Sequence, residues 1–143
     1  MERSASAVWN GSLREGKGTI STQSAVLSEA PYSFVTRFEN AKGSNPEELI
    51  AAAHAGCFTM ALSAQLGTMK ITPESLRTTA TVTLEKLEAG WTISKIHLDV
   101  TGHVPGISAE AFQSAAASAK QNCPVSRLLK AEISLTAKLE QAA

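Results

Sequence analysis

Residues 45–60 read Asn45-Pro46-Glu47-Glu48-Leu49-Ile50-Ala51-Ala52-Ala53-His54-Ala55-Gly56-Cys57-Phe58-Thr59-Met60, a mostly apolar stretch near the middle of this 143-residue chain. Asn45 suits a helix N-cap, Pro46 the first helical position, and Glu48 the capping-box position three residues on. We therefore expect a helix that runs to about residue 66 and ends at Gly67. Its many small residues would let another backbone approach closely, which predicts a buried central helix.

Short apolar runs separated by turn residues precede this helix. We expect strands over residues 6–9, 17–23 and 32–38, with turns at Asn10-Gly11, Glu15-Gly16 and Glu29-Ala30-Pro31. This pattern is typical of a meander or hairpin region.

An alternating pattern follows the helix. Residues 76–84 and 91–100, joined by a turn at Glu88-Ala89-Gly90, predict a long antiparallel hairpin, and a change of phase predicts a bulge near Ser94-Lys95. Ser108 caps a predicted helix over 109–121, a short helix follows from 124 to about 130, and a strand over 132–139 closes the chain. Because strands and helices are segregated, the predicted class is α+β, in a single domain over residues 1–143.

Composition excludes several classes of protein. Thirteen Lys and Arg balance thirteen Asp and Glu, which leaves no basic face for nucleic acid. Residues 1–9 lack the apolar run of a signal peptide. Polar residues interrupt 45–66, so we expect no membrane span and a soluble, cytoplasmic protein. In that reducing compartment, two cysteines more often serve catalysis, redox sensing or metal binding than a lasting disulfide.

Cys57 is the first of the two cysteines. His54 lies three residues earlier on the same predicted helix face, so a Cys–His nucleophile is one interpretation. The other is that Cys57 is a small core residue and His54 lies at the helix edge, since free cysteine is among the most buried residue types. Spacing alone does not decide between them.

Cys123 is the second cysteine and stands directly before Pro124. At an N-cap, its sulfur would face unpaired N–H groups and the positive end of a helix dipole, both of which lower a thiol pKa. Alternatively Asn122 is the cap and Cys123 only packs. The two thiols form a reversible dithiol couple only if the fold brings their Cα atoms within about 7 Å.

The other polar residues have ordinary structural explanations. Cysteines and histidines show no paired ligand spacing, so we expect no metal site. Glu47 and Glu48 are explained by helix capping and the helix dipole. Arg14 and Arg37 are by default exposed cations, although an arginine beside a thiol would stabilise its thiolate.

Two segments together resemble a known family. Residues 43–58 and Asn122-Cys123-Pro124-Val125-Ser126 strongly resemble the osmotically inducible protein C (OsmC) family, which is related to the organic hydroperoxide resistance proteins. The likeness covers nearly the whole chain, including Trp9-x-Gly11, Gly16-Lys17-Gly18-Thr19, Pro31-Tyr32 and Leu129-Lys130-Ala131-Glu132-Ile133. An N-P-E-E-L helix start ahead of a cysteine, with a late C-P, is a specific pattern.

The resemblance implies a thiol peroxidase that reduces alkyl and fatty-acid hydroperoxides to alcohols in oxidative and osmotic stress defence. By position, Cys57 would be the peroxidatic cysteine, which forms a sulfenic acid, and Cys123 the resolving cysteine, which forms a disulfide with it. Arg37 matches the family arginine and Glu47 the glutamate that holds it. In the organic hydroperoxide branch the arginine stands where Arg14 is here. His54 favours the osmotically inducible branch, and this chemistry calls for no cofactor or metal.

The resemblance also implies an assembly and a reductant. It implies an intertwined homodimer, with antiparallel sheets packed on two long central helices, and a dithiol reductant of the lipoyl type. Glu47 and Cys57 would be roughly 15 Å apart along one helix, at about 1.5 Å per residue. If Glu47 acts at the thiol, the partner chain therefore supplies it, and the alanine-rich helix face is where the two helices meet.

Three other functions remain open from the sequence. An apolar-ligand binding protein and a thiol redox sensor would both lack turnover with peroxide. A Cys57–His54 hydrolase has no accompanying oxyanion-hole signal in the sequence. Sustained peroxide consumption with a dithiol reductant separates the peroxidase from the first two. The hydrolase interpretation fails if His54→Ala keeps peroxidase activity while Cys57→Ser abolishes it.

Overall fold

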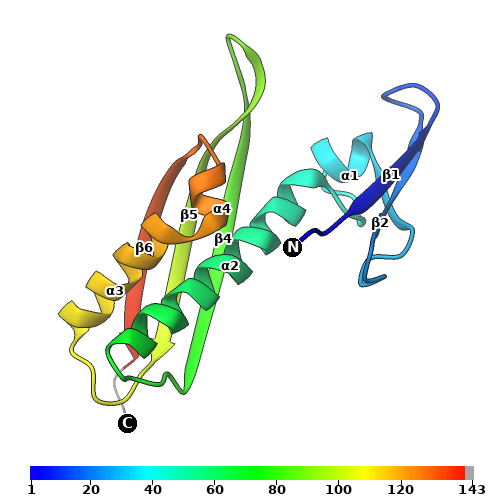
Figure 1. The fold of residues 1–143 in the computed structure, drawn as a ribbon. Coiled ribbons are helices and arrows are strands. Elements are labelled where there is room, and N and C mark those ends of the chain that lie inside the picture. Colours follow the sequence, from blue (N-terminus) through cyan, green and yellow to red (C-terminus); the bar gives the residue numbers. More distant parts are fainter. Residues whose placement is uncertain (141–143) are drawn as a thin grey trace. The chain divides into compact units, whose positions relative to one another are not determined.

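The structure is a computed structural model that describes residues 1–140. Its elements follow in the order β1, β2, β3, α1, α2, β4, β5, α3, α4 and β6 (Figure 1). The chain divides into two compact units, residues 1–49 and the residues from 50 onward. Each unit contains a three-stranded sheet. The predicted α+β class is confirmed.

An antiparallel sheet in the order β1-β2-β3 forms most of the first unit. Its strands are β1 (Ala5–Asn10), β2 (Lys17–Thr22) and β3 (Ala30–Ser33). Gly18, on the middle strand, pairs with Trp9 on one side and Tyr32 on the other. A Cβ at Gly18 would collide with both rings, so the glycine allows the two ring centroids to approach to 5.3 Å. The predicted strands over 6–9 and 17–23 are confirmed.

The third predicted strand is wrong beyond Ser33. The chain instead forms helix α1 (Phe34–Phe38). The N–H of Ser33 donates to Thr36 Oγ1 at 2.8 Å, and the N–H of Thr36 donates to Ser33 Oγ at 3.4 Å, which is a reciprocal capping box. This local cap outweighs the strand preference of the aromatic residues. The turn predicted at Glu29-Ala30-Pro31 lies earlier in the chain, because Pro31 is already part of β3. As an edge strand, β3 tolerates the missing N–H of a proline.

Helix α2 (Pro46–Thr68) begins where the sequence predicts, with the N–H of Glu48 donating to Asn45 Oδ1 at 2.8 Å. Contrary to the sequence expectation, α2 has the length and apolar composition of a membrane span. Core helices of soluble proteins share these properties. His54 and Phe58 of α2 are fully buried within the second unit.

The end of α2 lies beyond the predicted Gly67. Lys70, with φ of 60°, takes the left-handed position that a glycine would normally occupy. The N–H of Ile71 donates to the carbonyl of Leu66 at 3.1 Å, and the N–H of Lys70 donates to that of Gly67 at 2.9 Å. This pair of bonds is a Schellman closure, so Gly67 remains inside the helix.

A long antiparallel hairpin begins the second unit's sheet. Its strands are β4 (Ser75–Leu87) and β5 (Gly90–His103). The register shifts between Thr83 and Leu84, which leaves Ser94 of β5 without a position opposite it. The hairpin and its bulge are therefore confirmed.

The last strand, β6 (Glu132–Glu140), pairs with β5 in parallel. The fold therefore differs from one of purely antiparallel sheets. Parallel neighbours require a crossover, which here is made by α3 (Ala109–Asn122) and α4 (Pro124–Leu128). Ser108 caps α3 as predicted, accepting from the N–H of Ala111 at 3.1 Å.

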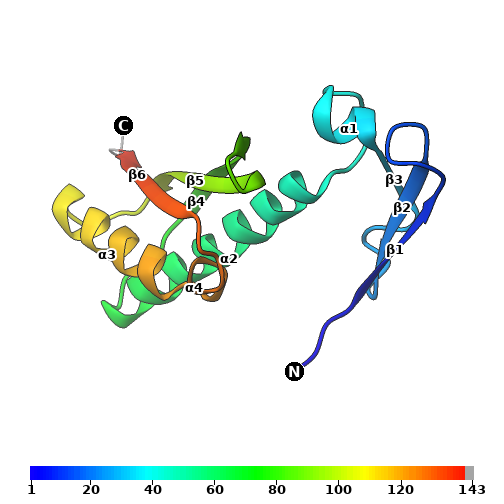
Figure 2. The same cartoon turned by 90° about the horizontal axis from the view of Figure 1, so that it is seen from above.

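In the second unit, the hydrophobic core lies between the β4-β5-β6 sheet and the helices, which cover one face of that sheet (Figures 1 and 2). Fully burying each large side chain contributes about 1.5–3 kcal/mol. The fully buried large apolar side chains come from α2, β5 and α3, and they are Phe58, Leu62, Leu66, Ile96, Leu98, Val100 and Phe112. The core packs α2, which carries Cys57, against the α3–α4 junction, which carries Cys123.

Candidate active site

The two cysteines are in direct contact. Cys57 lies on α2 and Cys123 between α3 and α4, and both are free thiols that hydrogen-bond with each other. Cys57 is half-buried, and Cys123 is fully buried in the core. The fold thus supplies the proximity that a dithiol couple requires and that sequence spacing could not show.

The two thiols differ in acidity. Burial raises the pKa of Cys57, and its hydrogen bond to Cys123 raises it further, while the Val125 N–H acts in the opposite direction. Burial alone would raise the pKa of Cys123 as well. Hydrogen bonds from Cys57 and from the N–H and hydroxyl of Ser126, with a smaller contribution from Val125, outweigh burial and lower the pKa of Cys123. Within this unit, Cys123 is therefore the more acidic thiol.

Cys123 occupies the position before α4 that the sequence favoured. It is the N-cap residue, with Pro124 at the start of the helix, so the alternative cap at Asn122 is wrong. Its sulfur lacks the full geometry of a cap hydrogen bond, but the first N–H groups of α4 still lower its pKa. The same junction also ends α3, since the N–H of Cys123 donates to the carbonyl of Ala119 at 2.9 Å.

His54 is fully buried and hydrogen-bonds Ser126 rather than lying at the helix edge. Its Nε2 is 2.7 Å from Ser126 Oγ. The imidazole is therefore engaged with the α4 serine, which weakens the Cys57–His54 hydrolase interpretation. Ser126 was not among the predicted site residues, although its place three residues after a helix-start cysteine was an available signal.

Arg37 and Glu47 form an ion pair in the first unit. Arg37 Nη2 donates to Glu47 Oε1 at 2.7 Å, and Arg37 Nε lies 3.2 Å from both carboxylate oxygens. Glu47 is nearly buried, whereas the Arg37 side chain is 37% exposed. The carboxylate thus fixes a guanidinium that remains accessible. The proximity of these two residues agrees with the family pattern.

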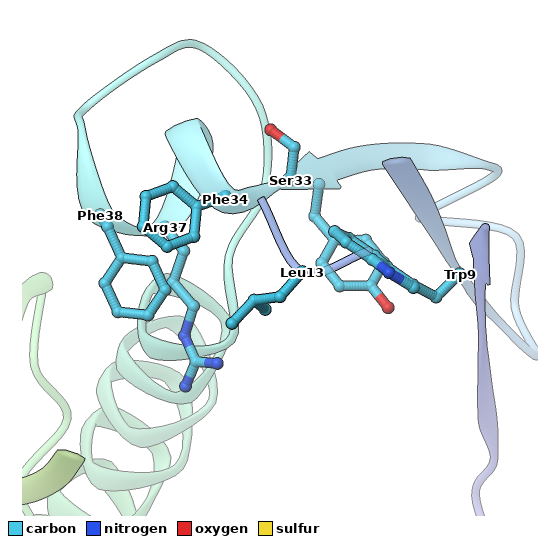
Figure 3. Close-up of a pocket in the computed structure, with 7 residues that line it drawn as sticks. Trp9, Leu13, Ser33, Phe34, Arg37 and Phe38 are labelled. Atoms are coloured by element: carbon cyan, nitrogen blue, oxygen red, sulfur yellow. The ribbon is translucent and has the colours of Figure 1, made fainter. Parts of the chain in front are cut away.

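An aromatic pocket of about 240 Å³ lies beside Arg37 (Figure 3). In Figure 3, Leu13 lies between Trp9 on one side and Phe34, Phe38 and Arg37 on the other. Tyr32 and Ser33 complete the lining. No local sequence signal predicts this pocket, because its residues come from β1, the following loop, β3 and α1.

Both candidate arginines lie over rings of this region. The Arg14 guanidinium is 5.0 Å from the centroid of Phe34, and that of Arg37 is 5.3 Å from the centroid of Phe38. Arg37 is the one that pairs with Glu47.

The remaining histidines have partners outside the thiol site. His97 hydrogen-bonds Ser134 and Thr136 on the sheet, at 2.6 and 3.1 Å, and His103 lies 3.0 Å from Glu74. Within residues 1–140, no group of three His, Cys, Asp or Glu side chains is arranged to hold a metal ion. The chemistry of the described residues is therefore that of thiols, an arginine–glutamate pair and an aromatic pocket.

Curated relatives match the chain over almost its full length. The chain is 52% identical over 140 residues to Peroxiredoxin OsmC of Escherichia coli and to Peroxiredoxin OsmC of Shigella flexneri, covering 98% of this chain and 98% of each relative.

Solved structures with lower sequence identity share the fold. An OsmC-like protein from Mycoplasma pneumoniae superposes with a TM-score of 0.76 at 17% identity, covering 99% of both chains. The organic hydroperoxide resistance protein OhrB of Bacillus subtilis superposes with a TM-score of 0.70 at 24% identity, covering 96% of this chain and 98% of its own. The family described as OsmC-like protein matches residues 39–138. The resemblance found in the sequence is thereby confirmed, and the chain belongs to the OsmC-like protein family.

Proposed function

We propose that this chain is a thiol-dependent peroxidase that reduces organic hydroperoxides to alcohols in oxidative and osmotic stress defence. Cys57 is the peroxidatic cysteine and Cys123 the resolving cysteine. The direct contact between two free thiols is the observation that carries the proposal. The 52% identity to proteins named Peroxiredoxin OsmC supports the reaction class.

The first step oxidises Cys57. Its thiolate attacks the terminal oxygen of the hydroperoxide, an S–O bond forms, and the O–O bond breaks. The products are Cys57 sulfenic acid and an alkoxide, which takes up a proton to become the alcohol. A thiol whose pKa is raised by burial needs a nearby cation to become a thiolate. Arg37, oriented by Glu47, supplies that cation.

The second step forms the disulfide. Cys123 thiolate attacks the sulfur of the Cys57 sulfenic acid, an S–S bond forms, and hydroxide leaves and is protonated to water. The lowered pKa of Cys123 suits this role, because it favours the thiolate form of the attacking cysteine. An external dithiol, which we propose is of the lipoyl type, then reduces the disulfide by thiol exchange and is itself oxidised.

The aromatic pocket supports the proposed substrate class. Its walls are mostly apolar and it opens beside the Arg37 guanidinium, which suits an alkyl or fatty-acyl chain attached to a polar peroxide group. Each methylene group buried there would contribute up to about 0.8 kcal/mol to binding. Apolar hydroperoxides should therefore be preferred to hydrogen peroxide.

We propose that the active form is an intertwined homodimer, in which residues 1–143 act as one domain. Within residues 1–49, all of which the structure describes, the buried positions are Gly16, Gly18, Thr36 and Glu47, so this unit buries no apolar side chain. A unit of this size without an apolar core is not stable alone. Exposed apolar residues on α2, such as Met60, supply a surface for a second subunit.

We propose that the two halves of the active site come from different subunits. Because Glu47 and Cys57 are roughly 15 Å apart along one helix, the Arg37–Glu47 pair of one subunit acts at Cys57 of the partner subunit. Co-expression of an Arg37→Ala chain with a Cys57→Ser chain tests this. A mixed dimer regains one intact site, so a statistical mixture should show about a quarter of wild-type activity. No recovery in verified mixed dimers would place both halves in one chain.

Turnover separates the enzyme from a binding protein or a redox sensor. We expect sustained consumption of cumene hydroperoxide and linoleic acid hydroperoxide with reduced lipoamide, and kcat/KM at least about tenfold lower with hydrogen peroxide. Leu13→Ser should raise KM for linoleic acid hydroperoxide and leave hydrogen peroxide kinetics unchanged. A single stoichiometric oxidation without turnover would instead identify a sensor, and binding without oxidation a ligand carrier.

A further inference from the structure

The buried pair His54 and Ser126 lies next to the thiols, and His54 has no role in the reaction described above. His54 comes from α2 and is fully buried, Ser126 comes from α4 and is 9% exposed, and the Nε2–Oγ distance is 2.7 Å. Among the described residues, His54 Nδ1 is buried with no hydrogen-bond partner. Burial also lowers the pKa of His54, so the ring is neutral near pH 7.

The unpartnered Nδ1 determines where the single proton of the neutral ring lies. A proton on Nδ1 would leave a buried N–H donor unpaired, which native structures rarely tolerate, whereas a bare acceptor is tolerated somewhat better. The proton therefore sits on Nε2, which donates to Ser126 Oγ. Because that bond uses an acceptor site of the oxygen, the hydroxyl proton of Ser126 is free to be donated elsewhere.

The sulfur of Cys123 is the available acceptor. Ser126 lies one helical turn after Cys123 on α4, and its hydroxyl acts on the sulfur so as to lower the pKa of Cys123. A hydroxyl favours a thiolate by donating to it. The titratable group that faces Cys123 is Cys57, from α2. Lys120 of α3 instead donates to the carbonyl of Ile133 at 3.2 Å, and Arg127 of α4 is exposed.

We propose that His54 is a positioning residue for Cys123, holding the Ser126 hydroxyl with its proton directed at the Cys123 sulfur. The inference rests on the proposed function, because it assigns this help to the resolving thiol. A chain of donors, from His54 Nε2–H to Ser126 O–H to Cys123, stabilises the thiolate that attacks the sulfenic acid. Loss of these hydrogen bonds slows disulfide formation by Cys123 and exposes Cys57 sulfenic acid to further oxidation.

The test measures the ionisation of Cys123 directly. The test uses the Cys57→Ser protein, in which the introduced hydroxyl can still donate to Cys123. The rate of Cys123 alkylation is followed against pH by intact mass. Ser126→Ala should raise the Cys123 pKa by about one unit, which is about a tenfold slower reaction below that pKa. His54→Leu should shift it in the same direction. His54→Gln, whose amide N–H can take the place of Nε2, should restore the low value.

Non-additivity shows whether His54 acts through Ser126. The double variant of His54→Leu with Ser126→Ala should shift the Cys123 pKa no further than Ser126→Ala alone. If His54→Leu does not fold, His54→Asn replaces it, because the shorter amide stops short of Ser126. An unchanged Cys123 pKa in the folded His54 variant, or additive shifts in the double variant, would overturn the proposal.

The chain offers a matched control in a second histidine–serine pair. His97 and Ser134 are 2.6 Å apart on the sheet, and His97→Leu and Ser134→Ala should leave the Cys123 pKa unchanged. The two proposals also fail differently. If hydroperoxide produces no Cys57–Cys123 disulfide in the wild type, the proposed function is refuted, whatever the pKa of Cys123. If the disulfide forms but the pH profile of Cys123 alkylation is the same in the His54 variants, only the positioning role of His54 is refuted.

Discussion

Glu47→Gln removes the negative charge that fixes Arg37 while keeping the size of the side chain. In the wild type, Arg37 Nη2 lies 2.7 Å from Glu47 Oε1, and Arg37 Nε lies 3.2 Å from both oxygens. A glutamine leaves one acceptor and turns an NH₂ group towards the guanidinium. Hydrogen bonds to charged groups contribute about 1.5–3 kcal/mol. Because Arg37 is 37% exposed, solvent screening reduces the expected loss to about 1 kcal/mol.

This loss should appear in catalysis as well as in stability. A released guanidinium spends less time in the orientation that stabilises the thiolate, so kcat/KM for cumene hydroperoxide should fall about fivefold. The free energy of unfolding should fall by about 1 kcal/mol. The assay is the initial rate of peroxide consumption with excess dithiol, with urea denaturation at fixed protein concentration. Glu48→Gln is the matched control, because Glu48 is the neighbouring exposed glutamate on the same helix turn.

Two results would contradict this role of Glu47. Equal kinetics for Glu47→Gln and Glu48→Gln would mean that the ion pair does not orient Arg37 for catalysis. A higher kcat/KM in Glu47→Gln would mean that Glu47 weakens the positive charge of Arg37 more than it positions that charge. In either case the glutamate would be structural only.

Three further predictions concern the second unit. Phe112→Ala should lower the free energy of unfolding by about 3–5 kcal/mol in urea denaturation, because the ring is fully buried, and a loss below about 1 kcal/mol would contradict this. Gly102→Ala should cost about 1–3 kcal/mol, since its Cβ would lie 2.6 Å from the Phe112 ring, and Phe112→Leu should relieve part of that cost. Burial lowers the pKa of His54, so the unfolded state binds more protons below pH 6.5, and stability should fall as the pH falls through that range, by at most about 1.4 kcal/mol per unit. His54→Leu should flatten this slope, and equal slopes in both proteins would contradict the burial argument.

Local rules predicted the elements whose signals lie close together in the sequence. Asn45, Pro46 and Glu48 gave the start of α2, Ser108 gave the start of α3, and the phase change gave the bulge at Ser94. Each depends on hydrogen bonds or alternation within a few residues. Such signals can be read without knowledge of the tertiary fold.

The errors arose where one local signal outweighed another or where partners are distant. The Ser33–Thr36 capping box turned an expected strand into α1, and Lys70 adopted a left-handed conformation that the sequence signal assigned to Gly67. The parallel pairing of β6 depends on the crossover through α3 and α4. Composition and periodicity contain no information on that connection.

The candidate site was predictable in part and by different routes. Cys123 at a helix start followed from Pro124, whereas the pairing of Arg37 with Glu47 was expected only from the family resemblance. The contact of Cys57 with Cys123 joins residues that are far apart in the sequence, so no local sequence pattern predicts it. Ser126 was missed because a serine three residues after a cysteine is common, and its significance depends on His54 packing against it.

We propose that Cys57 reacts with the peroxide before Cys123 does, although Cys123 has the lower pKa of the two thiols. Intact-mass analysis after a limiting dose of organic hydroperoxide tests the order directly. We predict loss of two hydrogens in the wild type, an added oxygen or overoxidation in Cys123→Ser, and no change in Cys57→Ser. An oxygen added at Cys123 in the Cys57→Ser protein, with consumption of the peroxide, would contradict the assignment of Cys57 as the peroxidatic cysteine.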